Sequence, residues 1–392
     1  MRANIRNLTW RGCRLGSLGS DQIHSFIVWL AVAIAVLGAA ASIDAQSSDS
    51  LVQCWSYREP ISVTGGVLID ESNVYAVASG DRVISLDRMN GAVVWTSEPG
   101  GSVTSPIRAV NSSIIFVSKT TAPNGRPAAS YVRAISKATG ITNWVTPLSQ
   151  TAIYSLAGSE KSIFAVAQAG PLVALDPANG TVRWSRDGSG FANKETYFGG
   201  DRVARFSGAK AVEVISLDSW KTIGRFELGF VPKVITTSPD RTLVAGDERG
   251  NLESISLDSF SRNWSYKAGG AISHLLIREG NVIATSADNF VYSISLSSGN
   301  VEWKRRMPGR INSIALLTDM NLGLTVVGEK TGYILDLSDG RFSGRVALEG
   351  DEEFAGHSLV GDGRFVVAIT NQGLTVFSTS CSALKAAGSP AA

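Results

Sequence analysis

Residues 83–95 have the sequence V-I-S-L-D-R-M-N-G-A-V-V-W, and variants of this stretch recur to the end of the chain. Val83 and Leu86 lie in an extended apolar run, and residues 87–91 supply turn chemistry that closes on Asn-Gly. A second apolar run then ends at Trp95. The pattern predicts two antiparallel strands joined by a tight turn, the second of which ends on a tryptophan.

Three further copies of this hairpin keep the tryptophan four residues after the turn glycine, at residues 132–144, 172–184 and 291–303. Weaker copies have lost part of the pattern. Residues 255–264 lack the glycine. Residues 215–226 lack both the glycine and the tryptophan, and Phe226 is the expected bulky substitute. A last copy turns at an Asp-Gly pair and is expected to end on Val346.

The spacing of the tryptophans indicates the architecture. They are Trp55, Trp95, Trp144, Trp184, Trp264 and Trp303. Successive members are separated by 40, 49, 40, 80 and 39 residues, so the period is about forty. A repeat of this length with about four short strands is typical of a β-propeller, because a lone four-stranded unit cannot bury its faces without a neighbour. We therefore expect the tryptophans to pack between neighbouring blades.

The repeat predicts eight blades once Phe226 and Val346 are counted as strand ends. The final blade lacks a last strand of its own, because the chain there has become Ala, Gly, Ser and Pro. Residues 51–57 form a strand with no preceding partners and are expected to complete the blade of residues 358–377. The expected fold is an all-β, eight-bladed propeller of four-stranded blades closed by the N- and C-terminal strands. Seven blades is the alternative.

The first 46 residues differ from the repeats. Four arginines precede an uninterrupted apolar run of 16 residues, 26–41, and Ala45 offers a cleavage site. Because the run is shorter than the roughly 20 residues that span a bilayer, we expect a signal peptide at 1–46. An uncleaved signal anchor is the alternative. The propeller then covers 47–380, and 381–392 is expected to be a disordered tail.

Composition narrows the range of partners. A net charge of +2 with 18% charged residues offers no field suited to nucleic acid or to an anionic membrane.

In an oxidising compartment Cys54, in the closing strand, and Cys381, just after its expected partner strand, would meet and form a disulfide. Two unrelated thiols are the alternative. In a eukaryotic host Asn111, Asn179 and Asn263 stand in glycosylation triplets, unless they only serve turn geometry.

The sequence carries no motif for chemistry. His274 and His357 are isolated from other metal-ligating residues, and no nucleophile elbow, phosphate-binding glycine loop or zinc-peptidase motif is present. The acidic positions Asp247 and 349–353 lack the alternating oxygen ligands of a calcium loop. We expect both to be solvated turns.

The repeat apolar-x-Ala/Ser-Leu-Asp-x-x-x-Gly-x-x-x-Trp, carried by residues 83–95 and 172–184, resembles that of the pyrroloquinoline quinone (PQQ) dehydrogenase-like propellers. The resemblance covers nearly all of residues 51–377. It implies an eight-bladed ring closed by its termini, with each tryptophan docking one blade onto the next. The superfamily includes both quinoprotein dehydrogenases of alcohols and sugars and members that are not enzymes.

The family's dehydrogenases use two adjacent cysteines, a calcium ion and an aspartate base, and this sequence has no adjacent cysteine pair. We therefore expect a non-enzymatic propeller without a cofactor, monomeric, secreted, luminal or periplasmic, that binds a protein on one face as a scaffold. Residues 26–41 would anchor it if the leader is retained. The alternative is a PQQ- and calcium-dependent dehydrogenase acting on alcohols or sugars.

Overall fold

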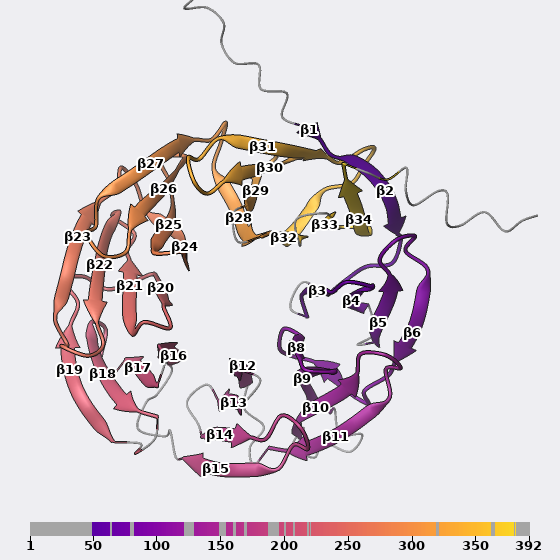
Figure 1. Cartoon of the computed structure of the whole chain (residues 1–392), viewed down its shortest axis with the longest axis horizontal. Helices are drawn as coiled ribbons and strands as arrows, with labels where there is room; N and C mark the ends of the chain where they lie inside the picture. Colours follow the sequence, from indigo (N-terminus) through magenta and orange to yellow (C-terminus); the bar gives the residue numbers. More distant parts are fainter. Residues whose placement is uncertain are drawn as a thin grey trace, which may run out of the picture. The chain divides into compact units, whose positions relative to one another are not determined.

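The computed structural model describes residues 49–62, 65–78, 82–120, 129–148, 154–159, 162–167, 171–186, 196–199, 201–206, 208–217, 219, 221–318, 321–361, 365–379 and 381. These residues form eight antiparallel sheets arranged in a ring, and no helix occurs among them (Figure 1). The expected all-β, eight-bladed propeller is confirmed. The leader predicted at 1–46 and residues 382–392 of the predicted tail lie outside the described residues.

Each blade has four strands, which we letter A to D from the centre of the ring outward (Figure 1). The A strands of blades 1 to 8 are β3 (Val67–Ile69), β8 (Arg108–Val110), β12 (Tyr154–Ser159), β16 (Thr196–Gly199), β20 (Val234–Thr237), β24 (Ile272–Arg278), β28 (Ile311–Leu316) and β32 (Phe354–Gly361), with β7 (Ser102–Val103) also in blade 2. The B strands are β4 (Asn73–Ala78), β9 (Ser113–Lys119), β13 (Ser162–Ala167), β17 (Arg202–Phe206), β21 (Thr242–Gly246), β25 (Asn281–Ser286), β29 (Asn321–Val326) and β33 (Phe365–Thr370).

The C strands are β5 (Arg82–Asp87), β10 (Ser130–Ser136), β14 (Leu172–Leu175), β18 (Ala211–Ser216), β22 (Asn251–Ser256), β26 (Phe290–Ser295), β30 (Thr331–Asp336) and β34 (Gly373–Ser378). The D strands, which form the outer wall, are β6 (Val93–Ser97), β11 (Thr142–Pro147), β15 (Val182–Arg186), β19 (Thr222–Glu227), β23 (Arg262–Lys267), β27 (Val301–Arg306), β31 (Phe342–Ala347) and β2 (Val52–Tyr57).

The core lies between the blades. In β5, four consecutive residues, Val83 to Leu86, are fully buried, because each face of the sheet packs against a different neighbouring blade. The outer strand β6 instead exposes Val93 and Val94 to solvent. The buried B and C strands therefore carry continuous apolar runs, whereas the D strands are mixed.

Antiparallel pairing places the connections at two opposite ends of the ring. The turns from A to B and from C to D open on one end, which we call the A–B face. The turns from B to C and the links from D to the next A strand open on the other, which we call the B–C face. Residues from different blades meet on these two faces.

The terminal segments close the ring as expected. Strand β2 pairs with β34, with Trp55 opposite Val376, and so becomes the D strand of blade 8. One addition was not predicted: β1 (Asp49–Ser50) runs parallel to β31 and adds a fifth strand to blade 7. The N-terminal segment therefore joins the sheets of two adjacent blades.

The structure corrects two of the predicted strand ends. Where Trp95 lies opposite Ser85 in blade 1, the equivalent position holds Gly224 in blade 4 and Gly344 in blade 7. The assignments of Phe226 and Val346 to this position were wrong. They assumed that a bulky residue must fill it, but at Gly224 the bulk comes from the next blade instead.

Candidate functional site

Tryptophans join neighbouring blades in a repeated arrangement. The indole N–H of the D strand donates to a carbonyl in the C–D turn of the next blade. The pairs are Trp55 with Arg88 (2.9 Å), Trp95 with Lys137 (2.9 Å), Trp144 with Pro177 (3.2 Å), Trp264 with Leu296 (2.7 Å) and Trp303 with Leu337 (2.8 Å). Trp184 packs on Phe164, with 5.9 Å between the ring centroids. Trp220 lies outside the described residues.

The turn glycine of the next blade lies beneath each of these five indoles. A Cβ atom at Gly140 would lie 2.5 Å from the ring of Trp95, and Gly140 also has a φ of 69°. Both the left-handed backbone and the close approach require glycine there. The same arrangement holds at Gly91, Gly180, Gly299 and Gly340.

The junction of blades 4 and 5 reverses this pair. Gly224 occupies the tryptophan position, and Phe260 occupies the turn position with a φ of 56°. A Cβ atom at Gly224 would lie 2.5 Å from the Phe260 ring. The large and the small residue have exchanged positions between strand and turn, so the space between the blades is still filled.

An ion-pair network on the A–B face connects the same two blades. Arg241 of blade 5 contacts Asp201 of blade 4 at 2.8 Å and Asp258 of its own blade at 3.3 Å. Asp258 also lies 3.6 Å from Arg202 of blade 4. These side chains are partly exposed, so we expect a modest contribution to stability.

Two contacts fasten the closing strand β2. Cys54 and Cys381 form a disulfide, with Cα atoms 5.3 Å apart and a sequence separation of 327. Cys54 is the unpaired residue of a β-bulge just before Trp55, and such a bulge re-aims a side chain. The second contact is the ion pair of Arg58 with Glu352.

Glu352 corrects the expectation of a solvated acidic turn at 349–353. It is 2% exposed, and both of its carboxylate oxygens accept from the Thr375 hydroxyl at 3.2 Å. A buried carboxylate requires such partners. Glu352 therefore links the D–A connection of blades 7 and 8 to strand β34 and, through Arg58, to the closing strand.

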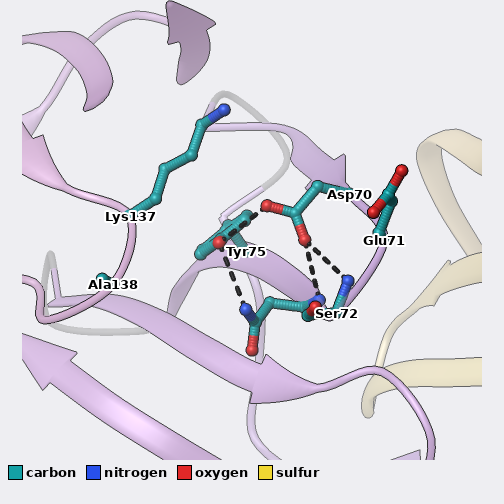
Figure 2. Close-up of a pocket in the computed structure, with 7 residues that line it drawn as sticks. Asp70, Glu71, Ser72, Tyr75, Lys137 and Ala138 are labelled. Carbon is teal, nitrogen blue, oxygen red and sulfur yellow. Dashed lines mark hydrogen bonds between the residues drawn. The ribbon is translucent and has the colours of Figure 1, made fainter. Parts of the chain in front are cut away.

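A pocket of about 380 Å³ lies on the A–B face between blades 1 and 2 (Figure 2). Asp70 accepts from the N–H groups of Ser72 and Asn73 at 3.0 and 2.9 Å, and from the Tyr75 hydroxyl at 2.9 Å. Burial, together with Asp70, raises the pKa of Tyr75 above its ordinary value. The phenol therefore stays protonated, and the carboxylate is engaged in holding the turn.

The same pocket presents two charged groups to solvent. Lys137 extends into it from the C–D turn of blade 2, and Glu71 lies on the opposite rim (Figure 2). This arrangement suits weak binding of a small polar group.

A larger groove, of about 550 Å³, lies on the B–C face at the junction of blades 4 and 5. We call it the blade 4–5 groove. It is lined by Lys210, Gly229, Phe230, Val231, Pro232, Lys233, Asp247, Glu248, Arg249 and Asn251. Val231, in the connection from blade 4 to blade 5, is 56% exposed. The groove thus combines apolar surface with three basic side chains and two acidic ones, of which Glu248 lies 3.6 Å from Lys233.

Asp247 at the base of this groove is also not the solvated residue expected from the sequence. It is 5% exposed and accepts from the Asn251 side-chain amide at 2.6 Å and from the N–H groups of Asn251 and Arg249 at 2.7 and 2.8 Å. Burial alone would raise its pKa. The hydrogen bonds and the charge of Lys267 outweigh burial, so the pKa lies below its ordinary value.

The described residues offer no set of ligands for the metal that a quinoprotein enzyme would need. No group of three or more His, Cys, Asp or Glu side chains in the described ranges is placed to hold a metal ion. His274 lies 2.8 Å from the Thr285 hydroxyl, and the side chain of His357 is outside the description. We derive no reaction step through a calcium ion. Within the same ranges, no helix has the length and apolarity to cross a bilayer.

The three predicted glycosylation positions are exposed. Asn111 lies in the turn between β8 and β9, and Asn263 donates to Ser254 at 3.3 Å. Asn179 accepts from both the N–H and the hydroxyl of Thr181. Accessibility is compatible with modification, which stays a prediction.

The ring of eight four-stranded blades, docked by tryptophans on turn glycines, defines an eight-bladed β-propeller of the PQQ-repeat type. The profile of the family described as "Outer membrane protein assembly factor BamB" matches residues 27–97, 128–342 and 207–383. The chain belongs to this family.

Two solved structures show the same fold. The crystal structure of BamB from Moraxella catarrhalis matches with a TM-score of 0.56 and 15% identity, over 84% of this chain and 97% of that one. The computationally designed Ika8 protein matches with a TM-score of 0.61 and 13% identity, over 83% and 99%. No curated protein sequence matches the chain.

Proposed function

We propose that this propeller is a non-enzymatic scaffold that binds a protein partner on its B–C face. The observation that supports the proposal is the blade 4–5 groove, where exposed Val231 is surrounded by Lys210, Lys233 and Arg249. Apolar surface rimmed by polar groups is typical of protein interaction sites. The family's description as an assembly factor agrees with this role.

The blade architecture supports the same role. The tryptophan hydrogen bonds between blades use the D strands and the C–D turns, which lie at the opposite end of the ring from the B–C turns and D–A links. They are surface connections held by a rigid frame, which is where binding residues commonly lie. Val231 and Val327 both occupy such connections, and both are more than half exposed.

A photo-crosslinking amino acid placed at Val231 tests the proposal in the full-length chain in its native cells. We expect it to trap a discrete protein partner. The same amino acid at Val301, an exposed valine on the outer strand β27, is the matched control and should trap none. Failure to crosslink at Val231, or equal crosslinking at both positions, would contradict binding on the B–C face.

We propose further that the scaffold works without PQQ or calcium, because no feature of the described residues favours the dehydrogenase alternative. Calorimetric titration of the folded full-length chain with PQQ and calcium should give no heat of binding. Micromolar binding followed by oxidation of alcohols or sugars with a dye acceptor would overturn this proposal.

We also propose that the chain is exported, with residues 1–46 acting as a signal peptide or as an uncleaved anchor, and that the propeller is monomeric. The disulfide between Cys54 and Cys381 agrees with an oxidising compartment. N-terminal sequencing of the protein from its native cells distinguishes the two leaders. In a eukaryotic secretory pathway we expect glycans at Asn111, Asn179 and Asn263, with Asn111 the best acceptor.

A further inference from the structure

The outer edge strands of three consecutive blades carry no charged residue. Strands β2, β6 and β11 belong to blades 8, 1 and 2 and follow one another along the outer wall (Figure 1). The other five D strands each carry at least one charge. Those charged residues are Arg183 and Arg186 in β15, Arg225 and Glu227 in β19, Arg262 and Lys267 in β23, Glu302, Lys304, Arg305 and Arg306 in β27, and Arg345 in β31. We call the β2, β6 and β11 edges the uncharged arc.

The uncharged arc also gathers exposed apolar side chains. Of the exposed large hydrophobic residues that the structure describes, six of eleven lie on its strands or next to them: Val52, Met89, Val93, Val94, Ile141 and Val145. The edge of a sheet has unpaired backbone N–H and C=O groups, and proteins usually protect such edges with charged side chains. Blades 8, 1 and 2 lack that protection.

The ring itself shows that the outer edge of a D strand can accept a further strand. In blade 7 the outer edge of β31 is covered by β1, which pairs in parallel with Gly344 and Arg345. This pairing begins directly after the β-bulge at Ser343. Every D strand has a bulge at the same position, as Val94 in β6 and Asn143 in β11 illustrate. The equivalent free positions are Trp95 and Thr96 in blade 1, and Trp144 and Val145 in blade 2.

The tryptophans at these positions do not obstruct a strand in the plane of the sheet. Their indoles lie over the turn of the next blade, where Trp95 and Trp144 donate to backbone carbonyls. Side chains stand roughly perpendicular to a sheet, whereas an added strand pairs within its plane. Among the described residues, no strand pairs with the outer edges of β6 and β11.

We propose that the uncharged arc is a second interaction surface, which binds an extended, charge-poor, β-branched segment of another protein by adding it as a fifth strand to a blade. The centre of this surface is β6, which has two exposed valines and a free edge after its bulge. Main-chain hydrogen bonds give such pairing its strength, and alternate side chains give it selectivity. This surface is separate from the blade 4–5 groove, so either can exist without the other.

The test uses the full-length chain in mild detergent and a fluorescent peptide of alternating Thr and Val. A second peptide has the same side chains but N-methyl groups on alternate residues, which remove the N–H donors of one edge. We expect the unmethylated peptide to bind and the methylated one to bind at least tenfold more weakly. Absence of binding, or equal binding of the two peptides, would overturn strand addition.

Variants locate the site. Thr96→Lys combined with Val145→Lys places a charge directly after the tryptophan position in β6 and β11, and should weaken binding of the unmethylated peptide at least tenfold. Ser265→Lys is the matched control, because Ser265 follows Trp264 at the same register in the already charged β23. The affinity of Ser265→Lys for the unmethylated peptide should stay within twofold of that of the wild type.

Two other results would contradict the proposal. Equal loss of binding in Ser265→Lys would place the site elsewhere on the wall. The second result would come from sedimentation of the wild-type chain and of the variant with Thr96→Lys and Val145→Lys. If the wild type is a dimer and the variant a monomer, the occupant of the uncharged arc is a second copy of this chain. Thermal unfolding checks each variant, and the pair of peptides tests the proposal even where a variant fails to fold.

Discussion

Phe260 lies against Gly224 across the junction of blades 4 and 5, reversing the tryptophan-on-glycine pair that joins other blades. In those pairs the large residue belongs to the D strand and the glycine to the next turn. Here the glycine belongs to the D strand, and the large residue stands in the turn at a φ of 56°. The space between the blades is filled in both arrangements. What differs is whether the D strand or the turn supplies the large side chain.

This relationship predicts a compensating pair of substitutions. Gly224→Trp alone should destabilise the chain by about 1–3 kcal/mol, because the indole would overlap the Phe260 ring. Phe260→Gly alone leaves a cavity but relieves the left-handed strain. The double variant should be more stable than the sum of the two single effects predicts. Urea unfolding of all four proteins measures this coupling, and additive effects would show that the residues do not share one site.

A second prediction separates backbone conformation from packing at the docking glycines. Gly140 and Gly328 have φ values of 69° and 75°, but a Cβ atom at Gly328 would meet nothing within 4 Å. Gly328→Ala should cost about 1 kcal/mol for the left-handed backbone alone. Gly140→Ala adds the clash with Trp95 and should cost about 2–4 kcal/mol. Equal losses in equilibrium unfolding would mean that the indole moves aside freely.

A third prediction concerns ring closure. The Cys54–Cys381 bridge joins residues with a sequence separation of 327, for which chain-entropy models give about 6 kcal/mol of stabilisation. Cys54→Ser, Cys381→Ser and the double variant should therefore lose the same amount of stability. Mass mapping of non-reduced peptides should recover the linked pair. If wild type and double variant unfold at the same denaturant concentration without reductant, the bridge does not hold the termini.

The fourth prediction uses the depressed pKa of Asp247. A carboxyl whose folded pKa lies below its unfolded value, about 3.9, adds stability above pH 4 and loses it as pH falls through the folded pKa. Asp247→Asn should therefore cost about 1–3 kcal/mol at pH 7 and much less near pH 2. Asp240→Asn, at an exposed turn of blade 5, is the control. A loss for Asp247→Asn that is the same at both pH values would exclude the charge as its cause.

Much of the propeller follows from the sequence because its information is local and repeated. The hairpin of residues 83–95 is encoded by turn residues at fixed offsets. Its copies at a period of about forty predict the blades, and the lone strand at residues 51–57 predicts the closure, both of which the structure confirms. The reversal at Gly224 and Phe260 also had a signal, since each residue stands where the repeat calls for the other.

The candidate sites were far less accessible from the sequence. The blade 4–5 groove combines Lys210, Val231 and Arg249 from three separate connections, and no short spacing links them. Asp247 and Glu352 looked like surface acids in the sequence. Glu352 accepts from Thr375 of a distant strand, whereas Asp247 accepts from Arg249 and Asn251 of its own turn, whose geometry the sequence did not show. The uncharged arc becomes visible only once the D strands are known to be edges.

The sequence by itself determined the repeat, the number of blades and the strand that closes the ring, since turn chemistry and strand periodicity are properties of neighbouring residues. Only the tertiary structure decided which side chains from distant parts of the chain meet, as Phe260 meets Gly224 and Arg58 meets Glu352. It also decided that β1 lies on β31. The reason is physical: close packing between blades fixes distances among residues far apart in the chain, and no local pattern encodes those distances.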